Sequence, residues 1–261
     1  MEVPEIKDIL YCKIMKIKYL FVVLLSYLRR KNKRSLIRRS FSLMGEKGLE
    51  IGGPSPIFKP MGGIPVYVFA GQIDNVIFST LTLWEGTVTK GYTFNYLPGK
   101  AGYQYIAEAT DLQEVPEGSY GFVLSSHNLE HVANPIKALY EWKRVLKSQG
   151  MLILVLPEKE NTFDHNRPFT SFDHLLTDFN NNVGEDDDTH VAEVLELHDL
   201  ESDPGKEAFK ARAADNLTTR TIHHHVFSMS LIREMLEYCG FAVEYQQQLP
   251  PFNLITIAKK R

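Results

Sequence analysis

From residue 48 onward, short apolar runs alternate with segments of helical periodicity, and this alternation constrains the fold more than any other feature. Apolar runs bounded by glycine, proline or polar turns are typical of strands buried on both faces. Strands that alternate with helices favour a mostly parallel sheet with covering helices. The expected strands span residues 49–51, 66–69, 103–107, 122–125, 151–156, 241–248 and 254–258.

Two of the expected helices have clear boundary signals. Asn134 can cap the first of them, and Pro135 suits its first turn because proline has no backbone N–H to lose there. The second covers residues 230–240, with Ser230 as the candidate cap and Gly240 as the stop.

The N-terminal segment is basic and partly apolar. Residues 1–40 contain eleven Lys or Arg and three Asp or Glu, whereas the remainder is acidic. The apolar run at 19–28 is too short for a membrane span, which needs about 20 residues. We expect residues 1–43 to form an amphipathic helical arm that packs on the domain or on a second chain, with contact to an anionic membrane surface as the alternative. Its apolar face comprises Ile14, Ile17, Phe21, Leu24 and Leu28.

Residues 44–261 are expected to form one domain. Its acidic character argues against nucleic acid as a partner, because phosphate binding needs a basic face. The alternation of strands and helices breaks at 158–222, a polar stretch that we expect to be an insertion on the substrate side of the site. Cys12 and Cys239 lie far apart without a CxxC spacing, which favours a reducing compartment and a cytoplasmic location, with peripheral membrane contact as the variant.

Four stretches share one order and spacing: LEIGG at 49–53, the segment 109–135, ALYEWKRVLKSQGMLILVLP at 138–157, and EMLEYCGFAVEY at 234–245. Together they resemble class I S-adenosylmethionine-dependent methyltransferases, and they are most similar to the type 11 group that includes ubiquinone- and menaquinone-biosynthesis methyltransferases. The resemblance covers residues 48–157 and 226–259. It implies a Rossmann-like α/β fold with a seven-stranded, mostly parallel sheet, helices on both faces and an antiparallel last strand.

The resemblance also implies a cofactor site for S-adenosylmethionine. Glu50 and Gly52 would meet the methionine end, because a glycine turn at a strand's carboxyl edge lets bare backbone approach a ligand. Asp111 would accept a hydrogen bond from the adenine amine, and the Leu112 N–H would reach a ring nitrogen. The other expected cofactor residues are Gly53, Asp74 and Ser126.

The glycine loop departs from the family pattern. Pro54 and Pro56 occupy the positions of the later glycines, so we expect the prolines only to fix the exit of the chain. The acidic residue that holds the ribose is also displaced. Asp74 lies twenty-two residues after Gly52, a plausible spacing, and Glu85 is the weaker candidate.

Nine histidines are many for this length. His127, His165 and His223 are the candidate catalytic groups, because each follows or precedes a strand or helix end that faces the expected crevice. His131 can pack on the sheet instead, and Asp164 and Arg167 can either grip a substrate or form local caps. A metal site formed by His223–His225 with residues 185–190 is conceivable, but packing and substrate contacts are the favoured interpretation.

The sequence therefore predicts a methyltransferase acting on a small-molecule, glycan or lipid acceptor, with S-adenosylmethionine as cofactor and no metal. A nicotinamide-dependent oxidoreductase is disfavoured because no G-x-G-x-x-G follows the first strand. Two alternatives remain: a non-catalytic binding or scaffold protein that kept the fold, and a membrane-attached methyltransferase acting on a lipid or glycan precursor, which the arm suggests.

Overall fold

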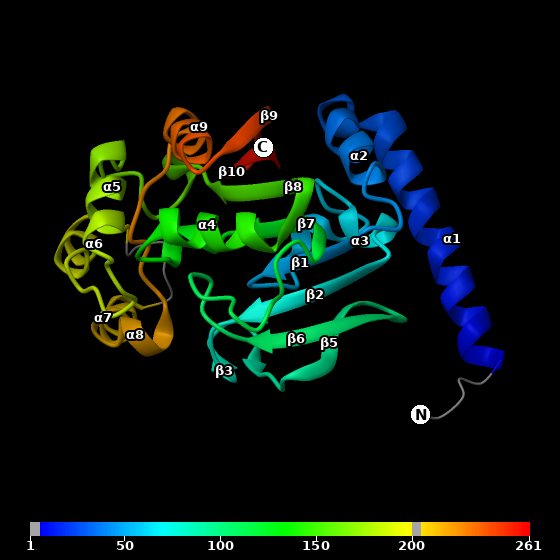
Figure 1. Cartoon of the computed structure of the whole chain (residues 1–261), viewed down its shortest axis with the longest axis horizontal. Coiled ribbons are helices and arrows are strands. Elements are labelled where there is room, and N and C mark those ends of the chain that lie inside the picture. Colours follow the sequence, from blue (N-terminus) through cyan, green and yellow to red (C-terminus); the bar gives the residue numbers. More distant parts are fainter. Residues whose placement is uncertain (1–5, 200–204) are drawn as a thin grey trace.

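The computed structural model describes residues 6–199 and 205–261, with side chains from residue 14 onward except that of Lys206. Within this part of the chain an eight-stranded sheet forms the centre of the molecule (Figure 1). Its spatial order is β5 (Gly91–Leu97), β6 (Lys100–Ile106), β2 (Gln72–Ile77), β1 (Lys47–Ile51), β7 (Tyr120–Ser126), β8 (Leu146–Pro157), β10 (Asn253–Lys260) and β9 (Phe241–Leu249). The expected α/β class is confirmed.

Strand directions also follow the expectation, with one addition. The five strands from β6 to β8 are parallel, and β10 runs antiparallel to β8 and β9. The expected count of seven strands was wrong, because β5 adds an antiparallel edge to β6. The turn between these two strands contains Gly99 at φ +72°, a conformation in which glycine avoids the strain of a side chain.

The prediction of the second strand at 66–69 was also wrong. These four buried residues form the short helix α3 (Val66–Phe69), and the second strand follows as β2. Pro65 stands immediately before the helical turn. Val66, Tyr67 and Phe69 pack against the neighbouring helix and the face of the sheet, and they do not pair with strands within it. Tertiary packing thus overrides the strong β-propensity of this run.

Helices cover both faces of the sheet, as predicted. Alternate residues of β8 divide between the two layers, since side chains of a strand point to opposite faces. Leu152 and Leu154 pack with Trp142 of α4 (Pro135–Val145) and with α9 (Met229–Tyr238), whereas Ile153 packs toward α3 and α2 (Arg34–Phe41). Asn134 caps α4 as expected by accepting from the Lys137 N–H at 3.0 Å, but the cap of α9 is Ser228, not Ser230.

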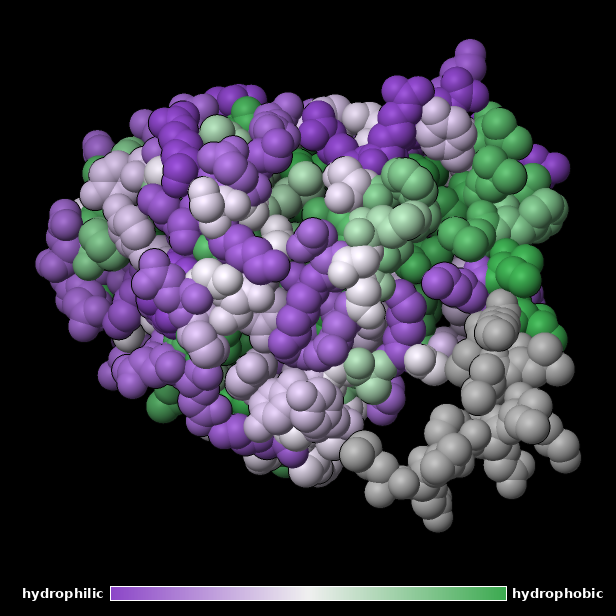
Figure 2. All heavy atoms as spheres, turned by 45° about the vertical axis from the view of Figure 1, so that its right-hand side comes forward, coloured by the Kyte–Doolittle hydropathy of each residue, from purple (hydrophilic) through white to green (hydrophobic). Residues whose placement is uncertain are grey.

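The arm forms α1 (Ile6–Arg29), a 3-10 turn η1 (Lys31–Lys33) and α2. Val23 of α1 packs on Ile37 and Val68, with Tyr19 and Tyr27 beside it. The predicted apolar face instead points to solvent, because Ile14, Ile17, Phe21, Leu24 and Leu28 are each more than half exposed. Figure 2 shows this side of the molecule as a hydrophobic surface over α1 and α2. Among the described helices, none combines the length and apolarity of a membrane span.

The described parts of the 158–222 segment, residues 158–199 and 205–222, form a group of short helices at one end of the molecule (Figure 1). They comprise η4 (Lys159–Asn161), α5 (Phe172–Asn180), α6 (Val191–Leu197), α7 (Lys206–Ala214) and α8 (Asn216–Thr219). Their own apolar cluster is small, with Val194, Phe209, Ala213 and Ile222 as its buried members. Short elements near the site complete the fold: η2 (Pro56–Phe58), η3 (Leu129–His131) and the hairpin β3 (Leu81–Thr82) and β4 (Gly86–Thr87).

Candidate functional site

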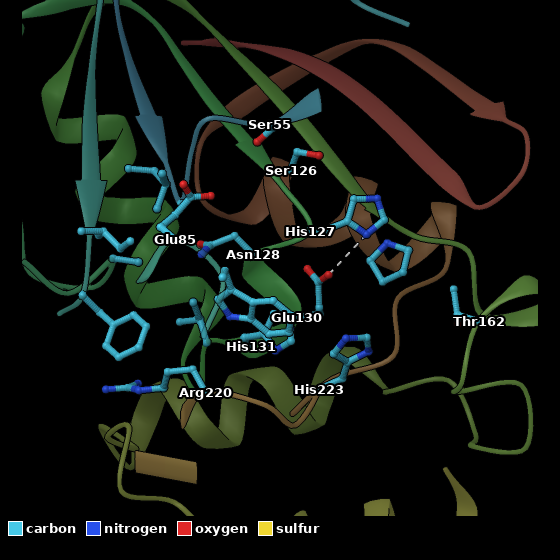
Figure 3. Close-up of a pocket in the computed structure, with 18 of the residues that line it drawn as sticks. Ser55, Glu85, Ser126, His127, Asn128, Glu130, His131, Thr162, Arg220 and His223 are labelled. Carbon is cyan, nitrogen blue, oxygen red and sulfur yellow. Dashed lines mark ion pairs between the residues drawn. The ribbon is translucent and has the colours of Figure 1, made fainter. Parts of the chain in front are cut away.

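A cavity of about 760 Å³ lies at the carboxyl ends of the parallel strands (Figure 3). Its wall contains residues that follow these strands: Gly52 after β1, Phe78 after β2, Glu108 after β6 and His127 after β7. Open α/β sheets bind ligands in this crevice, and the volume is in the range of sites for small-molecule ligands. The carboxyl ends of the strands thus form the cavity wall, at the edge of the sheet where the sequence places the crevice.

The loop after β1 presents Gly52, Pro54, Ser55 and Pro56 to this cavity. Gly52 adopts φ +77°, and a Cβ atom added there would lie 2.7 Å from Asn128 Nδ2. Only a glycine fits this position without strain. The prolines do more than fix the exit of the chain, because they form part of the wall.

Glu50 holds this loop through hydrogen bonds to the protein and does not line the cavity. Its carboxylate is fully buried and accepts from the Ser55 N–H at 3.0 Å and from the Tyr67 hydroxyl at 2.7 Å. Burial raises the pKa of Glu50 to about 7, although both hydrogen bonds work in the opposite direction. Gly53 likewise faces away from the cavity, and its N–H donates to Asn75 Oδ1 at 2.9 Å.

Asp74 lies inside β2 and away from the cavity. Its buried carboxylate accepts from Tyr120 and from the Tyr103 N–H at 2.8 Å each, and forms an ion pair with Lys47 at 2.8 Å. The expected strand at 66–69 would have ended before Asp74 and left this residue at the crevice. Because residues 66–69 form α3 and the strand β2 starts at Gln72, Asp74 lies within the strand instead. Glu85, on the β3–β4 hairpin, does line the cavity.

Asp111 and Leu112 also lie outside the cavity. The Leu112 side chain is fully buried in the core, and its N–H donates to Glu141 at 2.9 Å. Asp111 lines a separate surface depression near Arg144. Glu108 and Ala109 take their place in the cavity wall, because β6 ends at Ile106 and the chain turns before it reaches residue 111.

The sequence analysis missed Glu108. The stretch AEATDL contains two acidic residues, Glu108 and Asp111, and Glu108 is the one nearer the end of the strand. Glu108 Oε1 accepts from Arg220 at 2.8 Å, and Arg220 also pairs with Glu185. The Arg220 guanidinium carbon lies 5.0 Å from the centre of the Phe78 ring. Burial raises the pKa of Glu108, with Arg220 acting against this. Arg220 therefore links the insertion to the cavity wall.

His127 stands at the end of β7 with Ser126, and both line the cavity as predicted. Its φ of +50° is uncommon for a residue with a side chain, and such conformations are concentrated at functional sites. His127 Nε2 lies 3.0 Å from Asn253 Oδ1, and its ring meets Phe252 edge-to-face. These contacts fix the direction of the ring.

Glu130 is the second residue that sequence reasoning missed. Its side chain is almost fully buried, yet neither carboxylate oxygen has a hydrogen-bond partner among the described residues. Figure 3 shows the carboxylate between the rings of His127 and His223, with His127 Nδ1 at 3.7 Å. Burial raises the pKa of Glu130, and the two histidines oppose that shift. Buried unpaired carboxylates are rare and point to a missing partner such as a ligand.

The other histidines considered in the sequence also lie at this cavity, His131 in η3, His165 within the 158–222 segment and His223 just after it. The His223 Nδ1 atom lies 2.5 Å from Asp164 Oδ2, and His131 Nδ1 lies 3.0 Å from the Ile222 carbonyl oxygen. Burial works to lower the pKa of His223, but the Asp164 carboxylate outweighs it and the pKa is raised.

Asp164 and Arg167 form a buried pair rather than a free substrate grip. The Arg167 guanidinium donates to Asp164 Oδ1 at 2.9 Å, to Glu193 at 2.9 Å and to the His223 carbonyl oxygen at 2.8 Å. Burial alone would raise the pKa of Asp164, but His223 and Arg167 lower it well below its usual range. The pair thus holds His223 against the cavity.

Known proteins resemble this chain in part of its sequence and in its fold. A family model described as a methyltransferase domain matches residues 95–154, the stretch that contains Glu108, His127 and Glu130. Among proteins of curated function, none matches the sequence.

Several solved structures share the architecture. An S-adenosylmethionine-dependent methyltransferase of Mesorhizobium loti superposes with a TM-score of 0.51 at 13% identity, over 87% of this chain and 96% of that one. One of Methanosarcina mazei gives 0.48 at 18% identity, over 86% and 96%. The 1,6-didemethyltoxoflavin-N1-methyltransferase of Burkholderia thailandensis, solved with 1,6-didemethyltoxoflavin and S-adenosylhomocysteine, gives 0.48 at 10% identity, over 100% and 93%. At 13% identity, the likeness to the Mesorhizobium loti structure shows a shared fold and nothing more.

Proposed function

We propose that this chain, with the fold and in residues 95–154 the sequence signature of class I S-adenosylmethionine-dependent methyltransferases, is an enzyme that methylates a polar acceptor. One observation carries the proposal. Within the segment that matches the family, Glu108 and His127 both line one cavity, and the Gly52 loop lines the same cavity. The cofactor is S-adenosylmethionine, which supplies an electrophilic methyl group when bound.

The cavity wall fits this cofactor in its residue types. Gly52 lines the cavity with backbone and no side chain, which suits the amino-acid end. Within the described chain, Glu108 Oε1 is engaged by Arg220, and the other carboxylate oxygen can accept from an adenine amine. Glu85 is the carboxylate available for the ribose hydroxyls, in place of Asp74.

The opposite half of the cavity suits the acceptor. His127, Glu130 and His223 converge there (Figure 3), and His165 also lines the cavity. The unpaired Glu130 oxygens can accept from an O–H or N–H of the acceptor, and His127 lies close enough to Glu130 to share or take the proton. Methyl transfer otherwise depends on alignment and exclusion of water. An acceptor methylated equally fast by the wild type and Glu130→Gln would contradict this role.

Calorimetry with S-adenosylhomocysteine tests the cofactor assignment directly. We expect Glu108→Gln to weaken binding about tenfold or more, because hydrogen bonds to charged groups are worth about 1.5–3 kcal/mol. The matched control is Asp111→Asn, which makes the same chemical change three residues away but outside the cavity, and should bind like the wild type.

Two outcomes would overturn the proposal. If the wild type binds neither S-adenosylhomocysteine nor S-adenosylmethionine, the chain is a non-catalytic relative of the fold. If Asp111→Asn loses binding while Glu108→Gln keeps it, the cofactor lies in another orientation from the one proposed.

We also propose that the exposed face of α1 contacts an anionic membrane surface. The face that carries Phe21 and Leu24 is more than half exposed, and basic residues such as Lys18 and Arg29 border it. An apolar stripe flanked by cations is the pattern of a helix lying on anionic lipid.

Vesicle flotation tests this contact. Wild-type chain should float with phosphatidylserine-containing vesicles and much less with phosphatidylcholine alone, and the double variant Phe21→Glu, Leu24→Glu should stay in the bottom fraction. Leu217→Glu, at an exposed apolar position outside the arm, serves as control and should float like the wild type. Equal flotation of both variants would contradict the membrane contact, and a concentration-dependent dimer lost only in the arm variant would assign this face to a second copy.

A further inference from the structure

Four side chains from three segments of the insertion side converge outside the cavity. His174 and Asp178 lie one turn apart on α5, His190 precedes α6, and His225 precedes α9. One ligand atom from each lies within 4.8 Å of the others. Positions i and i+4 share a helix face, so α5 presents both of its groups in one direction. The sequence favoured packing for this histidine segment, and the fold instead gathers it with donors from residues 174–190.

The distances between these donors match the edges of a tetrahedral coordination shell. Zinc holds imidazole nitrogen and carboxylate oxygen at about 2.0–2.2 Å, so neighbouring ligand atoms are about 3.3 Å apart. His174 Nε2 lies 3.2 Å from His190 Nε2 and 3.3 Å from Asp178 Oδ2. His225 Nε2 lies 3.7 Å from the same Asp178 oxygen. Such a set needs only small side-chain adjustments to surround one cation.

Unpaired polar atoms point to the same place. Asp178 Oδ2 and His225 Nδ1 are buried and have no hydrogen-bond partner among the described residues. His225 Nε2 lies 3.2 Å from the Ala133 carbonyl oxygen, so either nitrogen of this ring is a potential ligand. Buried polar groups without partners are uncommon, and an ion bound by Asp178 Oδ2 and by one nitrogen of His225 would give the carboxylate oxygen a partner.

We propose that His174, Asp178, His190 and His225 bind a structural divalent zinc ion. Three imidazoles and one carboxylate are a donor set that zinc accepts, and four protein ligands leave no open position for chemistry. Asp187 and His224, whose Oδ2 and Nδ1 atoms lie 3.6 Å apart, stand beside the site as a second layer that borders His190.

The ion would tie the insertion to the segment that carries the cavity histidine. The insertion's own apolar cluster is small, so a metal supplies cohesion that its core does not. Because His225 is two residues from His223, fixing its ring also fixes the chain beside the cavity. Zinc binding at these four residues does not require methyl transfer, so zinc content and Tm can be measured whether or not the chain is a methyltransferase.

Metal content of the untagged full-length chain tests this site. After dialysis against zinc and then metal-free buffer, the wild type should retain one zinc ion per chain by mass spectrometry, and added zinc should raise its Tm. His174→Ala and Asp178→Asn should each lose the bound zinc and the Tm shift. The His174 side chain is 43% exposed, so its removal leaves no buried void, and circular dichroism confirms that the variant is folded.

Control variants separate this site from the other histidines. His165→Ala, outside the cluster, and His223→Asn, in a candidate group with Glu130 and His131, should both retain zinc. The proposal is overturned if the wild type retains no zinc, or if folded His174→Ala and Asp178→Asn retain as much as the wild type. Loss of zinc only in His223→Asn would place the ion in the cavity and would likewise overturn it.

Discussion

Replacing Arg167 by methionine should lower the free energy of unfolding by about 3–5 kcal/mol, because removing one partner of a buried ion pair leaves the other uncompensated. Arg167 is 2% exposed and joins Asp164, Glu193 and the backbone carbonyl of His223. Methionine fills similar space but donates nothing. The loss should therefore fall on the junction between the insertion and the cavity.

Urea denaturation at neutral pH measures this effect. Arg233→Met is the matched control, since it makes the same substitution in an exposed pair with Glu237 on α9. Exposed pairs contribute little, so its change should stay within about 0.5 kcal/mol. Equal stability losses in the two variants would show that the Arg167 contacts contribute no more than a surface pair.

Glu50→Gln should change the pH dependence of stability. The folded-state pKa of Glu50 is raised to about 7, so the folded chain binds this proton more tightly than the unfolded chain, where the ordinary value is 4.5. The resulting stabilisation is fully present below pH 4.5 and is lost as the pH rises through about 7. This difference corresponds to about 3 kcal/mol, because each pKa unit is worth about 1.4 kcal/mol.

The comparison of variant and wild type across pH isolates this group. A glutamine cannot ionise, and its amide can accept from the Ser55 N–H and donate to the Tyr67 oxygen. The stability of Glu50→Gln relative to the wild type should therefore rise by about 3 kcal/mol between pH 4.5 and pH 8. Glu117→Gln, at an exposed position, should show a nearly constant difference. A constant difference for Glu50→Gln too would mean that the buried carboxyl costs nothing when charged.

The sequence predicted most of the sheet because its strands carry a local signal. The closing strands at 241–248 and 254–258 match β9 and β10 closely, and the buried run 151–156 lies within β8, which begins five residues earlier at Leu146. The run 66–69 gave the same signal and folded as a helix, since a four-residue apolar segment has no periodicity that distinguishes a strand from a buried helical turn. The extra strand β5 was obscured by the glycines around it.

The candidate site was predicted in its position but only in part in its residues. Gly52, Ser126, His127, His165 and His223 reach the cavity, whereas Glu50, Gly53, Asp74, Asp111 and Leu112 do not line it. The first group lies at strand ends or in the flanking loops. In the second group, Glu50 and Gly53 were placed by the glycine turn, and Asp74, Asp111 and Leu112 by their position after a strand. A shift of three residues exchanges Asp111 for Glu108.

By itself, the sequence determined the layering of the fold, the edge of the sheet at which the cavity lies and the basic, apolar character of the arm. These properties follow from periodicity and charge, which are local. Only the tertiary structure decided that Glu130 is buried with no hydrogen-bond partner among the described residues, that Arg220 reaches Glu108, and that His174 and His225 meet. Each of these contacts joins distant segments, and the direction of a side chain across such a distance is set by packing rather than by its neighbours in the chain.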